Sequence, residues 1–186
     1  ILTVLDKFSK MVHLLPCNSS ITAAQTAHLF FNGVVKYHGI PSAIISDRDP
    51  RFTSKFWKEL WKLMGTQLKM STAYHPQSNG QTERTNRTVE EILRSMVNTN
   101  ANDWDQHLAA VEIAFNSSKQ SSTNHTPYEL NYGENIRLPL DIAVPSAEQS
   151  VVPGSVEFMQ RWQREMESAR EHMKKAQERQ KQQADK

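Results

Sequence analysis

Short apolar runs separated by polar connectors open the chain. Residues 1–5 and 12–16 are apolar and are joined by the polar stretch 6–10, whose length is typical of a hairpin. We therefore expect two antiparallel strands here. A third apolar run, at 43–46, follows a segment with helical spacing at 22–38. This order predicts a crossover that places 43–46 parallel to an earlier strand.

Apolar residues spaced three and four apart predict the helices. Two helices have complete start signals, because Thr22 with Gln25 and Thr126 with Glu129 each form a capping box. Glu83 falls in the first turns of a helix that follows a loop rich in turn-forming residues. The predicted helices cover residues 22–38, 55–64, the region from near Glu83 to 97, 104–115 and 127–132, and a half-exposed strand is predicted at 67–72.

The C-terminal part of the chain differs in composition from the rest. Leu, Ile, Val and Phe number 40, and 34 of them lie in the first 140 residues. Proline, glycine and few strongly apolar residues predict a linker at 138–156. In the segment 157–186, 20 of the 30 residues are charged or glutamine, which predicts a solvated helical arm. The expected domains are thus a core over 1–137, the linker and the arm.

A heptad pattern in the arm leaves a second interpretation open. Two sets of residues recur at heptad spacing: Met159, Met166 and Met173, and Trp162, Ala169 and Ala176. Alanine and methionine bury little in a coiled-coil seam, so a spacer helix is favoured over a coiled coil.

Charge and cysteine content exclude some classes of site. The chain has 22 Lys and Arg against 20 Asp and Glu, and this formal charge of +2 neither requires nor excludes nucleic acid. The single cysteine, Cys17, excludes an intramolecular disulfide and any zinc site built on several cysteines. Because no apolar run has the length of a membrane span, we expect no membrane partner.

Two carboxylates are placed for metal chemistry. Asp47 follows the strand predicted at 43–46, and sites in parallel α/β sheets form at the carboxyl ends of strands. Glu83 comes after 35 intervening residues, near a helix start. Paired carboxylates chiefly serve Mg²⁺ or Mn²⁺, because hard cations prefer oxygen ligands. Taken singly, each is equally consistent with an ordinary turn or helix-start acid.

The residues around both carboxylates resemble a known family. The segments 44–52 (IISDRDPRF) and 74–87 (YHPQSNGQTERTNR) are closely similar to the catalytic core of integrases of gypsy-type LTR retrotransposons, which are relatives of retroviral integrases. Asp47 and Glu83 match the second and third members of that family's D,D(35)E triad. Supporting matches extend the resemblance from residue 6 to residue 133.

The resemblance implies a fold, a reaction and partners. The fold would be an α/β, RNase H-like mixed sheet flanked by helices, with Asp47 and Glu83 as catalytic ligands of two Mg²⁺ or Mn²⁺ ions. The reaction would be 3′-end processing and strand transfer of element DNA into a target duplex by phosphoryl transfer. The implied partners are DNA and further copies of the chain, with cytoplasmic assembly and action in the nucleus.

The chain departs from the family pattern at its start. The family's first catalytic Asp lies on an opening strand that precedes the hairpin, and here the chain begins with the hairpin. Asp6 does not replace that residue, because it matches the hairpin Asp of the family. The sequence looks cut at both ends, so we expect the 186-residue chain to be inactive alone. The alternative is a non-catalytic, domesticated remnant that acts as a DNA-binding or dimerisation module.

Five polar residues near Glu83 are candidates for DNA contact. They are His75, Asn79, Arg84, Asn86 and Arg87. Those on the helix are equally consistent with a solvated face, and the loop histidine with an ordinary loop residue. Arg48 and Arg51 pair with the acidic site or reach phosphate, and the sequence does not decide which. Trp57, Trp61 and Trp104 are expected in the core, because they recur at helical spacing.

Overall fold

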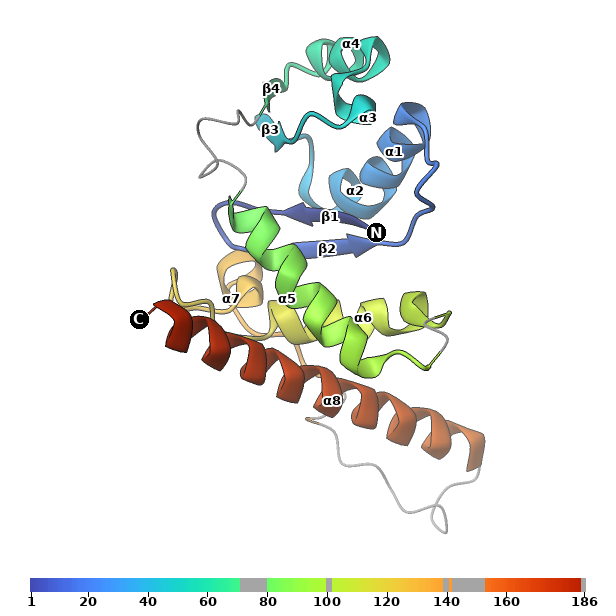
Figure 1. Cartoon of the computed structure of the whole chain (residues 1–186), viewed down its shortest axis with the longest axis vertical. Coiled ribbons are helices and arrows are strands. Elements are labelled where there is room, and N and C mark those ends of the chain that lie inside the picture. Colours follow the sequence, from blue (N-terminus) through green and yellow to red (C-terminus); the bar gives the residue numbers. More distant parts are fainter. Residues whose placement is uncertain (71–79, 100–101, 139–140, 142–152, 185–186) are drawn as a thin grey trace. The chain divides into compact units, whose positions relative to one another are not determined.

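The computed structural model describes residues 1–70, 80–99, 102–138, 141 and 153–184. The elements in chain order are β1 (Leu2–Leu5), β2 (Val12–Leu15), α1 (Ala23–Phe30), the π-helix η1 (Phe31–Val35), α2 (Lys36–His38), β3 (Ala43–Ser46), α3 (Pro50–Thr53), α4 (Lys55–Leu63), β4 (Gln67–Met70), α5 (Gly80–Met96), α6 (Trp104–Asn116), α7 (Pro127–Tyr132) and α8 (Pro153–Ala184) (Figure 1). None of the helices in these described ranges is both long and apolar enough to span a membrane.

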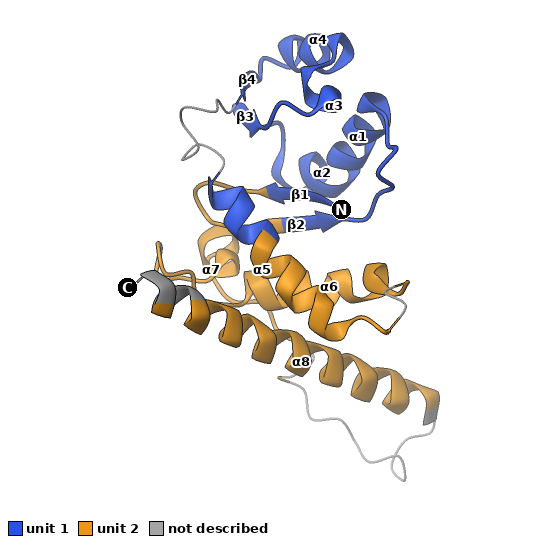
Figure 2. Cartoon of the chain, viewed as in Figure 1, with its two compact units in different colours: residues 1–4, 13–86 blue, residues 5–12, 87–186 orange. Residues whose placement is uncertain are grey.

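The chain forms two compact units (Figure 2). Unit 1 contains Ile1–Val4 and His13–Asn86, and unit 2 contains Leu5–Val12 and Arg87–Lys186. The two units are described separately below.

The predicted hairpin is confirmed. β1 pairs with β2, and the two strands run in opposite directions in Figure 1. The connecting turn closes with a hydrogen bond of 2.8 Å from the Asp6 amide to the Met11 carbonyl. The strands therefore begin and end within one residue of the predicted positions.

The strand at 43–46 is also confirmed, but its predicted partner is wrong. β3 pairs in parallel with β4, with Ala43 opposite Gln67 and Ser46 opposite Met70. In the part of the chain that the structure describes, β3 therefore joins a later strand and not an earlier one. The reason is the second helical segment, α3 and α4, which supplies the crossover that returns the chain beside β3.

The core of unit 1 forms between helices α1 and α4. Ala27, Phe30, Trp57 and Trp61 are buried together, and Ile44 of β3 and Leu68 of β4 pack against them. The Trp57 and Trp61 rings meet edge to face, with centroids 5.4 Å apart. The prediction that these two tryptophans lie in the core is confirmed, whereas Trp104 of α6 is only half-buried.

The helix predicted at 22–38 begins as expected, with a complete capping box at Thr22, but it is not continuous. Five residues of π-helix separate α1 from α2. Gly33 lies in this segment against β2, where a Cβ atom would stand 2.4 Å from Cδ2 of Leu15. A π-turn accommodates one extra residue in a helix, which apolar spacing alone does not reveal. Gly39 ends the segment at a φ of 77°.

The predicted helices of unit 2 are confirmed as α6 and α7, together with the part of α5 from Arg87 onward. α7 has the full capping box at Thr126 and ends at left-handed Gly133. Asn116, the last residue of α6, holds β2 through both groups of its side-chain amide. Its Oδ1 accepts from the Val12 amide at 2.9 Å, and its Nδ2 donates to the Val12 carbonyl at 2.8 Å.

The expectation of a solvated arm is wrong. α8 packs along α6, and the heptad residues Met166, Ala169, Met173 and Ala176 are at most 2% exposed. The composition misled because the seam is narrow and its small and flexible side chains contribute little hydrophobicity to the average. The helix also begins at Pro153, inside the predicted linker, and residues 139–140 and 142–152 of that linker lie outside the described residues.

Candidate functional site

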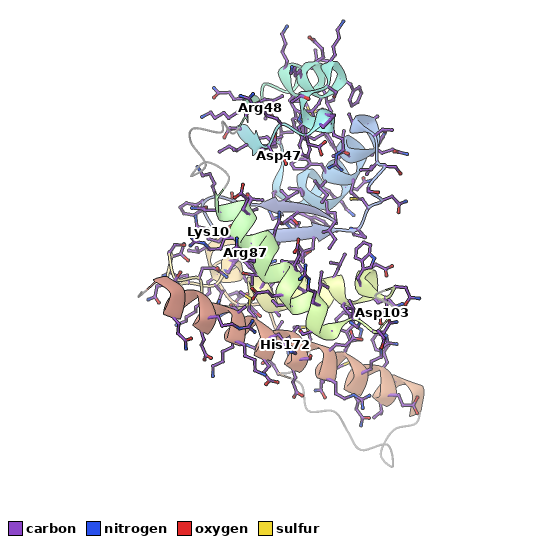
Figure 3. The ribbon with its side chains drawn as sticks, in the orientation of Figure 1. Lys10, Asp47, Arg48, Arg87, Asp103 and His172 are labelled. Atoms are coloured by element: carbon purple, nitrogen blue, oxygen red, sulfur yellow. The ribbon has the colours of Figure 1, made fainter. Side chains whose placement is uncertain are left out.

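Asp47 lies where the sequence predicts it, directly after β3, and its side chain is exposed (Figure 3). β3 is half-buried along its whole length, because Ile44 packs on the core of unit 1. The chain turns away at Asp47, and the amide of Asp49 donates to Asp47 Oδ1 at 3.1 Å. One oxygen of this carboxylate is therefore oriented by the backbone of the turn.

Asp49 and Arg51 form the best-defined polar contact of this turn. Arg51 donates to the Asp49 carboxylate from Nε at 2.8 Å and from Nη2 at 2.7 Å. Asp49 Oδ1 also accepts from the Arg51 amide at 2.9 Å, which caps α3. This pairing answers the question that the sequence leaves open, because Arg51 binds an acid within the turn.

The electrostatics follow from that contact. The hydrogen bond from Arg51 lowers the pKa of Asp49 below its ordinary value. The same hydrogen bond raises the pKa of Arg51, and the charges of Cys17 and Asp47 add smaller contributions. Arg51 is thus close enough to Asp47 to act on it electrostatically. Arg48, labelled beside Asp47 in Figure 3, is exposed.

Glu83 lies in the first turn of α5, as predicted, and its side chain is exposed. A carboxylate at this position is favoured by the positive end of the helix. Asp47 and Glu83 belong to the same compact unit. Among the described residues, no group of three or more His, Cys, Asp or Glu side chains is arranged to hold a metal ion.

The predicted DNA-contacting residues have different positions. Arg84 and Arg87 of α5 are exposed, as a DNA contact requires. Asn86 is half-buried, and its Oδ1 is a buried acceptor with no hydrogen bond from the described residues. His75 and Asn79 lie outside the described residues. A role in DNA binding stays a prediction for all five.

Two further polar contacts were not foreseen from the sequence. The Nε2 atoms of His13 in β2 and His38 in α2 lie 2.8 Å apart, although 25 positions separate these residues in the chain. No sequence spacing announces such a pair, because the fold brings the strand and the helix end together. Asp6 uses its carboxylate inside the hairpin turn, where it accepts from the Ser9 amide and the Ser9 hydroxyl, both at 2.7 Å.

The residues present fit a divalent cation in chemistry but not in number. Asp47 and Glu83 are exposed and offer carboxylate oxygens, which Mg²⁺ and Mn²⁺ prefer. Two carboxylates are fewer ligands than a two-metal site uses, and the described part of the chain holds no third one grouped with them. We therefore treat Asp47 and Glu83 as part of a metal site.

Comparison with known proteins identifies relatives along nearly the whole chain. No protein-family profile matches. The chain is 40% identical over 171 residues, 91% of its length, to the Transposon Tf2-3 polyprotein of Schizosaccharomyces pombe, and equally to the Tf2-4 polyprotein. The chain spans 12% of the length of these relatives.

Solved structures agree on the fold. An intasome of simian T-cell lymphotropic virus, solved with the PP2A regulatory subunit B56 gamma, matches 81% of this chain and 52% of its own with a TM-score of 0.61 and 20% identity. The HTLV-2 integrase catalytic core domain in complex with magnesium matches 69% of this chain and 81% of its own, with a TM-score of 0.56 and 19% identity. The chain is thus a relative of the Tf2 transposon polyproteins, with the RNase H-like fold of retroviral integrase catalytic cores.

Proposed function

We propose that the chain is the catalytic-core segment of an integrase, which joins the ends of a transposon's DNA to a target duplex. The observation that carries the proposal is the placement of two acids in a chain with this fold. Asp47 follows β3, Glu83 lies in the first turn of α5, and both belong to unit 1. The HTLV-2 core, solved with magnesium, makes a divalent cation the cofactor that we propose here.

The chemistry assigned to this site is phosphoryl transfer between DNA strands. Bound Mg²⁺ or Mn²⁺ ions activate an attacking water or 3′-hydroxyl and stabilise the leaving 3′-oxygen. Asp47 and Glu83 supply carboxylate oxygens as ligands, and the Asp49 amide orients Asp47 through Oδ1. One phosphorus–oxygen bond forms as another breaks, so no covalent link to the protein is needed.

The proposal includes the partners of the reaction. DNA is the substrate, and the exposed Arg84 and Arg87 of α5 are candidate phosphate contacts. The HTLV-2 core has been solved in dimeric and trimeric forms, which supports self-association as part of the proposal. Integration into chromosomal DNA takes place in the nucleus, so the protein is placed there.

Manganese binding tests the shared site. We expect Asp47→Asn and Glu83→Gln each to weaken Mn²⁺ binding by the 186-residue chain, measured by electron paramagnetic resonance of the free ion. Glu59→Gln is the matched control, because Glu59 is another exposed acid of unit 1, on α4. Unchanged binding in both site variants, or an equal loss in the control, contradicts the proposal.

We also propose that this chain alone does not join DNA, because only two carboxylates of the described residues are assigned to the site. The measurement is strand transfer of a labelled oligonucleotide duplex into plasmid DNA with Mg²⁺ or Mn²⁺. We expect no joined product. Metal-dependent joining by the purified chain overturns this part of the proposal.

A further inference from the structure

The turn at residues 6–11 in unit 2, here called the 6–11 turn, is held rigidly from inside. Ser9 is completely buried, and its hydroxyl donates to the Asp6 carboxylate at 2.7 Å. The same hydroxyl accepts from the Met11 amide at 3.2 Å and from Nδ2 of Asn131 in α7 at 3.1 Å. Because Asn131 belongs to a separate helix, the turn is fixed to the body of unit 2.

This rigid turn presents a large aromatic side chain to solvent. Phe8 is 78% exposed, although its neighbour Ser9 is fully buried. Lys10 has a left-handed backbone, with φ 65°, and its Nζ donates to the Lys7 carbonyl. The backbone is therefore set so that Phe8 projects outward between two lysines, and little conformational freedom remains to be lost when the turn binds a partner.

The chemistry of the tip favours nucleic acid over an apolar partner. An aromatic ring stacks on any unpaired base, and ammonium groups beside it bind the flanking phosphates. Lys7 is exposed and Lys10 is half-buried, so both charges lie at the rim of the ring. An apolar surface would have to desolvate these charges without compensating them. DNA supplies both the stacking face and the counter-charge.

We propose that the 6–11 turn is a DNA contact, in which Phe8 stacks on an unpaired base of the DNA end and Lys7 and Lys10 bind adjacent phosphates. The inference rests on the proposed function for its substrate. It adds a contact that lies on a different segment of the chain from Asp47 and Glu83.

The test is DNA binding by the 186-residue chain in the presence of EDTA, so that metal binding at Asp47 and Glu83 does not contribute. The probes are a fluorescent duplex with an unpaired 3′ overhang and its blunt-ended counterpart, followed by anisotropy. We expect Phe8→Ala to raise the Kd for the overhang duplex about 5- to 150-fold, the effect of one stacked base, without changing the salt dependence. Phe8→Trp keeps the stacking face and should retain tight binding.

Lys7→Gln provides the second signature. It should weaken binding to both duplexes and lower the slope of log K against log salt by about 1, because one phosphate contact is lost. Phe158→Ala is the matched control, because Phe158 of α8 is 60% exposed and lies outside the turn. It should leave both Kd values unchanged.

Three results overturn the inference. They are an unchanged Kd for Phe8→Ala, an equal loss for Phe158→Ala, and no DNA binding by the unmodified chain. A fourth is a Phe8→Ala variant whose sedimentation mass falls while its Kd for DNA stays the same, since the turn would then bind another copy of the chain. None of these results affects the manganese test, so failure of this inference is distinguishable from failure of the proposed function.

Discussion

The guanidinium of Arg51 binds the carboxylate of Asp49 through two hydrogen bonds, of 2.8 Å from Nε and 2.7 Å from Nη2. The amide of the same Asp49 donates to Asp47. The ion pair therefore fixes the peptide that orients a proposed metal ligand. A bidentate arginine contact of this kind restricts both side chains more than a single hydrogen bond does.

The first prediction separates the ion pair from the helix cap. Asp49→Asn keeps a residue that caps helices well but removes the charge, so it should lower the free energy of unfolding by only about 0.5 to 1 kcal/mol. Arg51→Lys loses the bidentate geometry and should have a similar effect. Urea denaturation measures both.

The pH dependence of these variants gives the sign check. The folded state lowers the pKa of Asp49, so the ion pair's contribution is present above the unfolded-state value of 3.8 and is lost as pH falls through the lower folded-state value. We expect Asp49→Asn to remove that acid-side loss. An Asp49→Asn variant with the unmodified chain's acid profile contradicts this assignment.

The second prediction concerns the amide of Asn116, which is 1% exposed and pairs with both backbone groups of Val12. Asn116→Ala leaves a buried amide and a buried carbonyl without partners and should cost about 2 to 5 kcal/mol. Asn116→Asp keeps an acceptor for the Val12 amide but places a carboxylate against the Val12 carbonyl. It should therefore be destabilised more strongly at pH 7 than at acid pH, measured by thermal unfolding.

Sequence patterns predict the elements of this fold well because its caps and apolar spacings are local. Thr22 and Thr126 each begin a helix with the predicted capping box. The partner of β3 was not predictable in the same way, since strand pairing depends on where the α3–α4 crossover returns the chain. The burial of Met166 also depends on α6, which lies far from it in the sequence.

The candidate site divides along the same line. Asp47 and Glu83 are recognisable from their spacing and from the motifs around them. The partner of Arg51 is not, because Asp47 and Asp49 are both within reach in the sequence and the geometry of the turn selects Asp49. The contact between His13 and His38 has no sequence signal at all.

The third prediction tests the close approach at Gly33. A methyl group there would stand 2.4 Å from Cδ2 of Leu15, so Gly33→Ala should destabilise the fold by about 1 to 3 kcal/mol despite the better helix propensity of alanine. Leu15→Ala removes the clashing group. In a double-mutant cycle the two changes should therefore cost less together than the sum of their separate effects. Additive effects contradict the contact.

The fourth prediction is an alkaline transition at Tyr128, which is 8% exposed. Burial raises its pKa from 10.0 to about 12, with a smaller contribution from the charge of Glu112. Because the folded state holds the proton more tightly, its stabilising effect is complete below pH 10 and is lost as pH rises toward about 12.

Difference absorbance of tyrosinate should show one tyrosine that ionises near pH 12 in the folded chain. The signal should be missing in Tyr128→Phe. Tyr37, which is 64% exposed, serves as the comparison through Tyr37→Phe, which should leave the late transition in place. Loss of the late transition in Tyr37→Phe instead contradicts the assignment.

The last prediction asks what holds α8 against α6. Two kinds of contact are present, the buried seam that includes Met166 and Met173, and an ion pair of 3.8 Å between Arg179 and Glu91 of α5. The ion pair is largely exposed, so Arg179→Ala should change the free energy of unfolding by less than about 1 kcal/mol. Met166→Ala should cost about 2 to 5 kcal/mol, because the side chain is fully buried and its removal leaves a cavity. Guanidinium denaturation of both variants measures the difference, with Gln160→Ala on the exposed side of α8 as the control. A larger loss for Arg179→Ala than for Met166→Ala would mean that charge, and not the apolar seam, attaches this helix.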